Sequence, residues 1–199
     1  MIKIGLTGGI GTGKSTVSRM LIASGFKVLD ADLVARDVLN RYPEILEKVK
    51  VEFGEGFFDW RGEFRRKEFG NHIFRFPKQR VKYENIIIPY IKKAIYEALD
   101  RYEENGAEMV ILDAPTLIEN DLHKDMDYVM LVWADTNTQI QRVMFRDKLS
   151  KSDAIGRINA QMSLEDKKEV AQILINNNGD LTKTKSQVDD IVEFLKSIL

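Results

Sequence analysis

A glycine-rich segment near the start of the chain has the residue types and spacing of a phosphate-binding loop. It reads Gly8-Gly-Ile-Gly-Thr-Gly-Lys-Ser15, with the two glycines, the lysine and the serine that define this loop. Glycines let the backbone turn tightly enough to direct several N–H groups at phosphate oxygens. Lys14 is expected to reach the β- and γ-phosphates of ATP, and the Ser15 hydroxyl is expected to contact Mg²⁺. The segment therefore predicts a nucleotide-binding protein that handles phosphoryl groups.

The residues on either side favour this interpretation over an ordinary glycine-rich turn. A β-branched run at residues 2–6 leads into the loop, and apolar Val17, Met20 and Leu21 follow it at helical spacing. A helix that begins at about Lys14 directs the positive end of its dipole at the same phosphates. We expect Lys14 to be exposed in the loop, so that its loss leaves the fold nearly intact.

Two aspartates that follow short apolar runs are candidates for phosphoryl-transfer chemistry. Asp32 comes two residues after Asp30, beyond the run at residues 27–29. A kinase needs a carboxylate that orients or deprotonates the acceptor hydroxyl, and Asp32 is our choice; the alternative is that it only caps the helix predicted to start at the next residue. Asp113 ends a buried-strand pattern at residues 109–112 and is expected to hold Mg²⁺ through water, or alternatively to form a turn at the strand end.

Two arginines lie on a helix predicted at residues 138–147. Arg142 and Arg146 are four residues apart, so their guanidinium groups share one face of the helix. They are candidates for clamping the phosphoryl group in transit, because its transfer is favoured by positive charge around the equatorial oxygens. More basic residues follow, and we predict a lid at residues 148–165. The alternative is that both arginines are solvated surface groups.

Short apolar runs alternate with helical patterns along the chain and predict the elements that position these residues. The runs lie at residues 2–6, 27–29, 109–112, 128–133 and 172–175. This alternation predicts a three-layer α/β fold with a mostly parallel five-stranded sheet, in one domain over residues 1–199. Amphipathic stretches at residues 33–39, 45–53, 81–88 and 91–102, without a convincing strand, predict a helical insertion at residues 33–105. Its segment 53–62 is rich in glycine and aromatic residues and is predicted to be a turn-rich corner packed by its own rings.

Composition argues against several other classes of protein. The 199 residues include 30 Lys and Arg against 31 Asp and Glu, a net charge of −1 that gives no support for binding nucleic acid or an acidic membrane. With no cysteine, the chain has no disulfide, thiolate metal site or cysteine nucleophile. No export-signal pattern is visible, and no apolar run approaches the roughly 20 residues that span a bilayer. We expect a cytoplasmic protein without a membrane partner.

Several stretches taken together resemble dephospho-coenzyme A kinase over nearly the whole chain. They are residues 5–18, 28–36, 112–119, 141–147, 157–161 and 175–179. The phosphate loop is common to many families, whereas the Asp-Ala-Asp element followed by Ala35 and Arg36 is much more specific. The chain departs from the usual pattern of that family at Ile88, Thr116 and Gln172.

The resemblance implies a P-loop kinase fold that transfers the γ-phosphoryl group of ATP to the ribose 3′-hydroxyl of dephospho-coenzyme A. It implies that Asp32 is the base and that the insertion supplies much of the acceptor site, where Asp32, Arg36 and Glu119 bind the acceptor. Contacts to ATP fall on Gly11, Thr12, Gly13, Lys14, Ser15, Thr16 and Asn177. The chain is expected to act as a monomer or a weak oligomer.

Two other functions share part of this pattern. A nucleoside or deoxynucleoside monophosphate kinase would have the same loop, carboxylate and lid. A regulatory GTPase or a non-catalytic nucleotide-binding module is disfavoured, because no guanine-reading Asn-Lys-x-Asp element follows a predicted strand.

Overall fold

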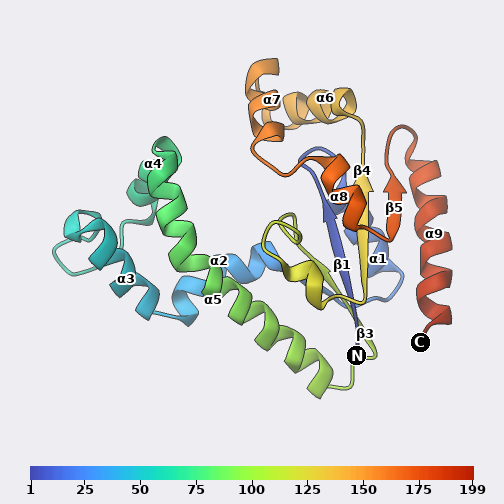
Figure 1. The fold of residues 1–199 in the computed structure, drawn as a ribbon, viewed down its shortest axis with the longest axis horizontal. Helices are drawn as coiled ribbons and strands as arrows, with labels where there is room; N and C mark the ends of the chain where they lie inside the picture. Colours follow the sequence, from blue (N-terminus) through green and yellow to red (C-terminus); the bar gives the residue numbers. More distant parts are fainter. The chain divides into compact units, whose positions relative to one another are not determined.

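The computed structural model describes all 199 residues and contains a single five-stranded parallel sheet (Figure 1). The strands are β1 (Ile2–Gly8), β2 (Val28–Asp30), β3 (Met109–Asp113), β4 (Tyr128–Trp133) and β5 (Ile173–Asn176). Their order is β2-β3-β1-β4-β5, and every neighbouring pair is parallel. The predicted α/β fold is confirmed. The glycine-rich loop leaves the carboxyl end of the central strand, the edge at which ligands bind in such sheets.

The chain divides into two compact units, which we describe separately. The sheet unit comprises Met1–Asp30 and Leu99–Leu199, and the helical unit comprises Ala31–Ala98. In the sheet unit, α1 (Lys14–Ala23) and α9 (Leu181–Ser197) cover one face of the sheet, as Figure 1 shows. Val17 and Leu21 from α1 and Val188 from α9 form a buried cluster with sheet residues such as Ile4.

The opposite face of the sheet is covered in part by the segment that follows β3. At Gly5, a β-carbon would overlap the side chain of Leu117, so the absence of a side chain allows this segment to pack directly on β1. The segment continues into the short 3₁₀ helix η2 (Leu122–Asp125). Further along the chain, α8 (Leu164–Val170) packs against β4. Each face of the sheet is therefore buried, which accounts for the continuous apolar runs of β3 and β4.

Two further helices follow β4 in the sheet unit. They are α6 (Thr136–Asp147) and α7 (Lys151–Asn159). Val143 and Ile140 of α6 pack with Ala154 of α7 in a small separate cluster. The predicted lid segment 148–165 thus contains α7, the turn after it and the first two residues of α8.

The helical unit begins directly after β2. It contains α2 (Ala31–Arg41), α3 (Glu44–Phe53), the 3₁₀ helix η1 (Glu55–Phe57), α4 (Arg66–Arg75) and most of α5 (Pro77–Glu104). Its core centres on Phe69, which is 2% exposed and whose ring lies 5.0–5.1 Å from four other aromatic rings. In the predicted aromatic corner, residues 53–62, the ring of Phe58 packs against Phe64, which lies outside that segment, and Trp60 is 87% exposed.

Helix α5 differs from the sequence expectation because it runs unbroken through Pro89. The pattern suggested separate helical stretches on either side of this proline, which lacks an N–H and normally ends or kinks a helix. Ile86, Ile87, Tyr90 and Ile91 flank it and pack against the core of the helical unit. This packing on both sides of Pro89 compensates for the missing hydrogen bond. No helix of the protein has both the length and the apolar character needed to cross a membrane.

Candidate active site

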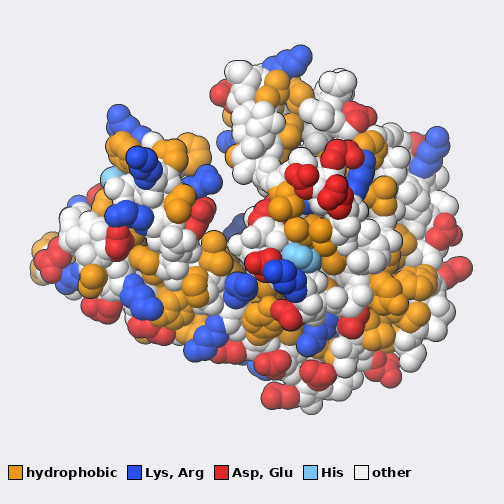
Figure 2. Space-filling model, viewed as in Figure 1, with side chains coloured by type: hydrophobic (Ala, Val, Ile, Leu, Met, Phe, Trp, Pro, Cys, Tyr) orange, Lys and Arg blue, Asp and Glu red, His pale blue; other side chains and the backbone are white.

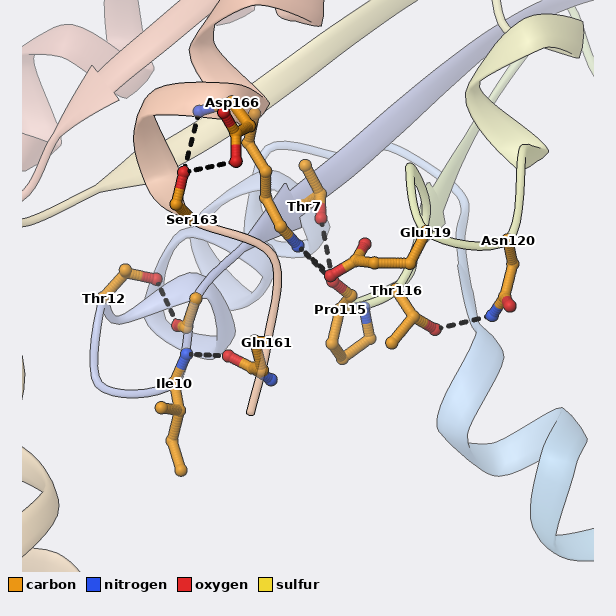
Figure 3. Close-up of polar contacts among 12 residues, drawn as sticks. Thr7, Ile10, Thr12, Pro115, Thr116, Glu119, Asn120, Gln161, Ser163 and Asp166 are labelled. Atoms are coloured by element: carbon orange, nitrogen blue, oxygen red, sulfur yellow. Dashed lines mark hydrogen bonds and ion pairs between the residues drawn. The ribbon is translucent and has the colours of Figure 1, made fainter. Parts of the chain in front are cut away.

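The glycine-rich loop joins β1 to α1 and is closed by its own hydrogen bonds. The Thr12 hydroxyl donates to the Gly9 carbonyl oxygen at 2.8 Å, and Thr12 is completely buried (Figure 3). Gly13 has a left-handed backbone with φ of 89°, and a β-carbon there would overlap the side-chain amide of Asn177. Only glycine meets both requirements without strain. The amide of Asn177 in turn donates to the Thr12 carbonyl oxygen at 2.7 Å.

Lys14 and Asp113 form an ion pair at the end of the sheet. Lys14 occupies the first position of α1, and its side chain is only 16% exposed, while that of Asp113 is 7% exposed. The expectation of an exposed loop lysine is therefore wrong, because the buried carboxylate at the end of β3 draws the ammonium inward. Asp30 is the register partner of Asp113 on β2, so both side chains leave the sheet on the same face.

Arg142 of α6 connects the loop to the end of β5. Its Nη2 donates to the Asn177 carbonyl oxygen at 2.8 Å, and its Nη1 lies 3.4 Å from the carbonyl oxygens of Gly11 and Thr12. The Asn177 side chain is fixed by the hydroxyl of Thr184, which donates to it at 2.7 Å. Predicted site residues from three distant parts of the sequence are thus brought together.

These residues border a cleft of about 250 Å³ beside the loop. It is lined by Gly13, Thr16, Arg142, Asn177, Gly179 and Leu181. Leu181 is 54% exposed and is the apolar side chain of the lining. Sequence patterns did not single out Leu181, since an exposed leucine at the start of a helix carries no signal of its own. The cleft combines an arginine, an amide and an apolar surface, which suits a planar polar ligand.

Arg146 does not share the partners of Arg142, although both lie on α6. Its guanidinium binds the Asp147 carboxylate through two hydrogen bonds of 2.7 and 2.9 Å. Arg157 of α7 also donates to Asp147, at 2.9 Å. The hydrogen bond from Arg146, followed by the charges of both arginines, holds the pKa of Asp147 below its usual value. Asp147 therefore pairs with two exposed arginines, one at the end of α6 and one in the predicted lid segment 148–165.

Two glutamines that sequence reasoning missed hold Ile10 at the tip of the loop. Gln139 of α6 donates its side-chain amide to the Ile10 carbonyl oxygen at 2.7 Å. Gln161, from the predicted lid segment, accepts a hydrogen bond of 2.8 Å from the Ile10 N–H, as Figure 3 shows. Neither glutamine has a spacing that would reveal it, because the three residues meet only in the folded chain.

Asp32 and Arg36 lie one turn apart on α2, and both are exposed. Helix α2 begins at Ala31, so Asp32 is inside its first turn and Asp30 directly precedes it. The alternative in which Asp32 caps a helix starting at the next residue is therefore wrong. Because Asp32 is two residues from Asp30, the chain itself keeps its backbone within about 7 Å of the end of β2.

Glu119 lies in the segment between β3 and η2, next to a lysine that the sequence analysis did not consider. The ammonium of Lys167 is 2.9 Å from its Oε1 atom, and the Lys167 side chain is completely buried. Burial lowers the pKa of Lys167, and Lys14 lowers it further, while the contact with Glu119 raises it. Thr116, in the same segment, is exposed and accepts a hydrogen bond from Asn120 at 2.9 Å.

The arrangement of acidic groups suits a cation that arrives with a phosphate ligand. No three His, Asp or Glu side chains gather in a way that could enclose a metal ion. Mg²⁺ commonly binds through one or two protein oxygens, with waters and substrate phosphates completing its shell. The Ser15 hydroxyl in the first turn of α1 and the Asp113 carboxylate are oxygen ligands of this kind.

Three features together define the P-loop kinase class. They are a glycine-rich loop after the central strand of a parallel sheet, a buried lysine–aspartate pair and an arginine bound to the loop. Residues 2–183 match the family model of dephospho-CoA kinase. The chain belongs to this family.

Individual relatives agree with this assignment. The chain is 61% identical to the dephospho-CoA kinase of Clostridium perfringens, over 98% of each chain. It is 48% identical to that of Clostridium tetani, over 99% of this chain and 87% of the relative. Among solved structures, the dephospho-CoA kinase from Campylobacter jejuni superposes with a TM-score of 0.74, covering 99% of this chain and 98% of the other. At 23% identity, that likeness concerns the fold.

Proposed function

We propose that this protein transfers the γ-phosphoryl group of ATP to the ribose 3′-hydroxyl of dephospho-coenzyme A, giving coenzyme A and ADP. This is the last step of coenzyme A biosynthesis. The observation that carries the proposal is the match to the dephospho-CoA kinase family over residues 2–183, in a chain whose glycine-rich loop is intact. Family membership also favours this acceptor over the nucleotide acceptors of similar kinases.

ATP is placed by the loop and by the cleft beside it. Backbone N–H groups from Gly11 to Thr16 would surround the phosphates, and the positive end of the α1 dipole faces them. Lys14 would exchange part of its contact with Asp113 for the β- and γ-phosphates. The cleft bordered by Arg142, Asn177 and Leu181 would take the nucleoside part of ATP, with Leu181 against the base.

Asp113 and Ser15 would hold Mg²⁺ together with the phosphates. When bound, the ion neutralises charge that develops on the phosphate oxygens. Asp113 is suited to this role because its carboxylate is fixed at the end of β3 and, once Lys14 turns to the phosphates, needs a new positive partner.

Asp32 would act as the general base. As the acceptor oxygen attacks the γ-phosphorus, its proton passes to the Asp32 carboxylate, the bond from phosphorus to the β–γ bridging oxygen breaks, and ADP leaves. Arg36 and Glu119 would bind the acceptor. Arg142 and Arg146 would stabilise the charge of the transferring group, and Arg146 would have to leave Asp147 to do so. Residues 148–165 would act as a lid, and their Arg157 also binds Asp147. The helical insertion, residues 33–105, would supply the remaining acceptor contacts.

The deciding experiment measures ADP release by a coupled assay with dephospho-coenzyme A and with a panel of nucleoside monophosphates and nucleosides. We expect a kcat/KM for dephospho-coenzyme A at least a hundredfold above every other acceptor, about 2.7 kcal/mol in transition-state stabilisation. ³¹P NMR of the product should show a new 3′-phosphomonoester. A preference for any nucleotide acceptor would contradict the proposal.

We further propose that the protein acts in the cytoplasm, since the reaction consumes ATP, and that it works as a monomer or weak oligomer. Cell fractionation and sedimentation velocity test these two points.

A further inference from the structure

Lys167 is the largest fully buried charged side chain of the protein, and nothing in the proposed reaction uses it. It lies on α8 and is 0% exposed. A buried ammonium is unfavourable unless it is paired and hydrogen-bonded, so a lysine at this position requires an explanation. The next residue, Lys168, shows the ordinary alternative, because it is partly exposed and pairs with Glu165 on the surface at 2.9 Å.

The contacts of Lys167 connect α8 to the segment after β3. Its Nζ donates to the carbonyl oxygen of Pro115 at 2.7 Å and lies 2.9 Å from Oε1 of Glu119. The same Pro115 oxygen accepts a hydrogen bond of 3.1 Å from the hydroxyl of Thr7, near the end of β1 (Figure 3). The ammonium thus joins α8 to the segment 114–119, and the Pro115 oxygen joins that segment to the strand that leads into the glycine-rich loop.

The start of α8 is itself fixed. Ser163 caps the helix by accepting a hydrogen bond of 3.1 Å from the Asp166 N–H, and its hydroxyl donates to the Asp166 carboxylate at 2.7 Å, as Figure 3 shows. Lys167 is the next residue, so its backbone position is determined by this cap. The lysine therefore extends from a rigid support toward the segment that carries Glu119.

Glu119 has hydrogen-bonding capacity that the protein does not use. Its two carboxylate oxygens have almost no solvent-accessible surface, although the side chain as a whole is 22% exposed. Apart from the Lys167 ammonium, 2.9 Å from Oε1, they have no hydrogen-bond donor within the protein. A carboxylate has about four acceptor sites, and buried oxygens that lack donors are rare in folded proteins. Such oxygens are suited to receive hydroxyl or amino groups from a bound molecule.

We propose that Lys167 is a positioning residue, which holds the Glu119 carboxylate in place to accept hydrogen bonds from hydroxyl or amino groups of the acceptor substrate. This inference rests on the proposed function, because it assigns Glu119 to the acceptor. Lys167 itself touches neither substrate, since its side chain has no exposed surface. Loss of its charge leaves the Glu119 carboxylate without a positive partner and removes one of the two hydrogen bonds to the Pro115 oxygen. The segment 114–119 then shifts to relieve the uncompensated charge.

The test compares Lys167→Met, which keeps the length and removes the charge, with Lys167→Arg, which keeps the charge. We expect Lys167→Met to lower kcat/KM for dephospho-coenzyme A by about tenfold to a hundredfold, as small misplacements of binding groups do. The Kd for ATP, measured by calorimetry without acceptor, should stay within about twofold of wild type. Lys167→Arg should recover most of the acceptor kcat/KM, and Lys168→Met, the matched control on the same helix, should leave it unchanged.

A double-mutant cycle with Glu119→Gln identifies the group through which Lys167 acts. In the Lys167→Met background, Glu119→Gln should reduce acceptor kcat/KM much less than it does alone, because the carboxylate is already misplaced. If Lys167→Met does not fold, the double variant Lys167→Met/Glu119→Gln tests the proposal instead, because it has no buried charge without a partner. A wild-type kcat/KM for the acceptor in this double variant would overturn the proposal.

Other results would also overturn it. A Lys167→Met enzyme with unchanged acceptor kcat/KM, or one in which ATP affinity falls as much as acceptor kcat/KM, assigns Lys167 to the fold alone. Additive losses in the cycle exclude action through Glu119. If the wild-type protein does not phosphorylate dephospho-coenzyme A, the proposed function itself is wrong. That result is distinct from a failure of the role proposed for Lys167.

Discussion

The charged residues with proposed roles in the reaction differ in their burial and in the partners that they bind before any substrate is present. Arg142 is bound to two carbonyl oxygens of the loop and to that of Asn177 just after β5, whereas Arg146 is bound to its neighbour Asp147. Lys14 is paired with a buried aspartate, and Asp32 is exposed on α2. These differences lead to separate expectations for each residue.

Asp32→Asn tests the assignment of the general base. Asparagine has nearly the same shape but cannot accept the proton, and general bases typically contribute on the order of 10² to 10⁴ in rate. We expect kcat to fall at least about a hundredfold, with ATP affinity and melting temperature nearly unchanged. Asp30→Asn should have a smaller effect on kcat. If Asp32→Asn keeps more than about a third of the wild-type kcat, the base is another group.

Arg142→Ala and Arg146→Ala should separate ATP binding from lid chemistry. Loss of hydrogen bonds from a charged group typically costs about 1.5–3 kcal/mol, so Arg142→Ala should weaken ATP binding roughly tenfold to a hundredfold and also lower kcat. Arg146→Ala should lower kcat with little change in the Kd for ATP, because Arg146 does not contact the loop before closure. Calorimetry and steady-state kinetics measure both effects. Unchanged kcat in both variants would exclude both arginines from phosphoryl transfer.

At the scale of elements, the segment after β3 is held against the sheet by a close contact. Leu117, which is completely buried, packs where Gly5 of β1 has no side chain. The same segment carries Pro115 and Glu119, so the position of these residues depends on how closely it can approach the strand. A larger residue at position 5 would displace it.

Gly5→Ala should therefore destabilise the protein and impair acceptor binding. Overpacking of a buried contact typically costs about 1–3 kcal/mol in the free energy of unfolding, measured here by urea denaturation. Gly70→Ala is the matched control, because this helical glycine of α4 has open space around it. Alanine there should increase the free energy of unfolding by at most about 1 kcal/mol. Wild-type stability of Gly5→Ala would show that Leu117 can yield without penalty.

At the scale of the whole molecule, ligand binding and folding are linked through the Lys14–Asp113 pair. Removing Lys14 alone leaves the Asp113 carboxylate buried without a positive partner, which is strongly destabilising. In Lys14→Ala alone, the effect of lower stability therefore cannot be separated from the effect of lost ATP binding. The double variant Lys14→Ala/Asp113→Asn removes the buried charge together with the lysine.

Thermal unfolding with and without Mg²⁺ and ATP tests this linkage. ATP at about a hundred times its Kd should stabilise the wild type by roughly 2.7 kcal/mol, which raises Tm by about 5–10 °C in a chain of this size. Lys14→Ala/Asp113→Asn should have a higher Tm than Lys14→Ala but no shift with ATP. As a control, Lys185→Ala breaks an exposed pair on α9 and should keep the full shift. A full shift in the double variant would exclude Lys14 from ATP binding.

The sequence by itself determined the α/β class, the phosphate loop and the strand-end position of Asp113, because these depend on local periodicity and on residues that are adjacent in the chain. The phosphate-loop motif, with its glycines before Lys14 and Ser15, lies entirely within eight consecutive residues. The family resemblance likewise came from short ordered stretches. Predicted strand ends were close, with β5 at Ile173–Asn176 against an expected 172–175.

Only the tertiary structure decided how side chains far apart in the sequence share partners. Pro89 stays inside α5 because packing on both sides outweighs its local preference. Asp32 lies within its helix, Arg146 turns to Asp147, and Lys167 is buried against Glu119, none of which follows from spacing. Local propensity and periodicity predict the helix or strand to which a residue belongs. Burial and charge pairing depend instead on contacts between elements that come together in the fold. A lysine on a short, charged helix such as α8 therefore resembles a surface group until the fold encloses it.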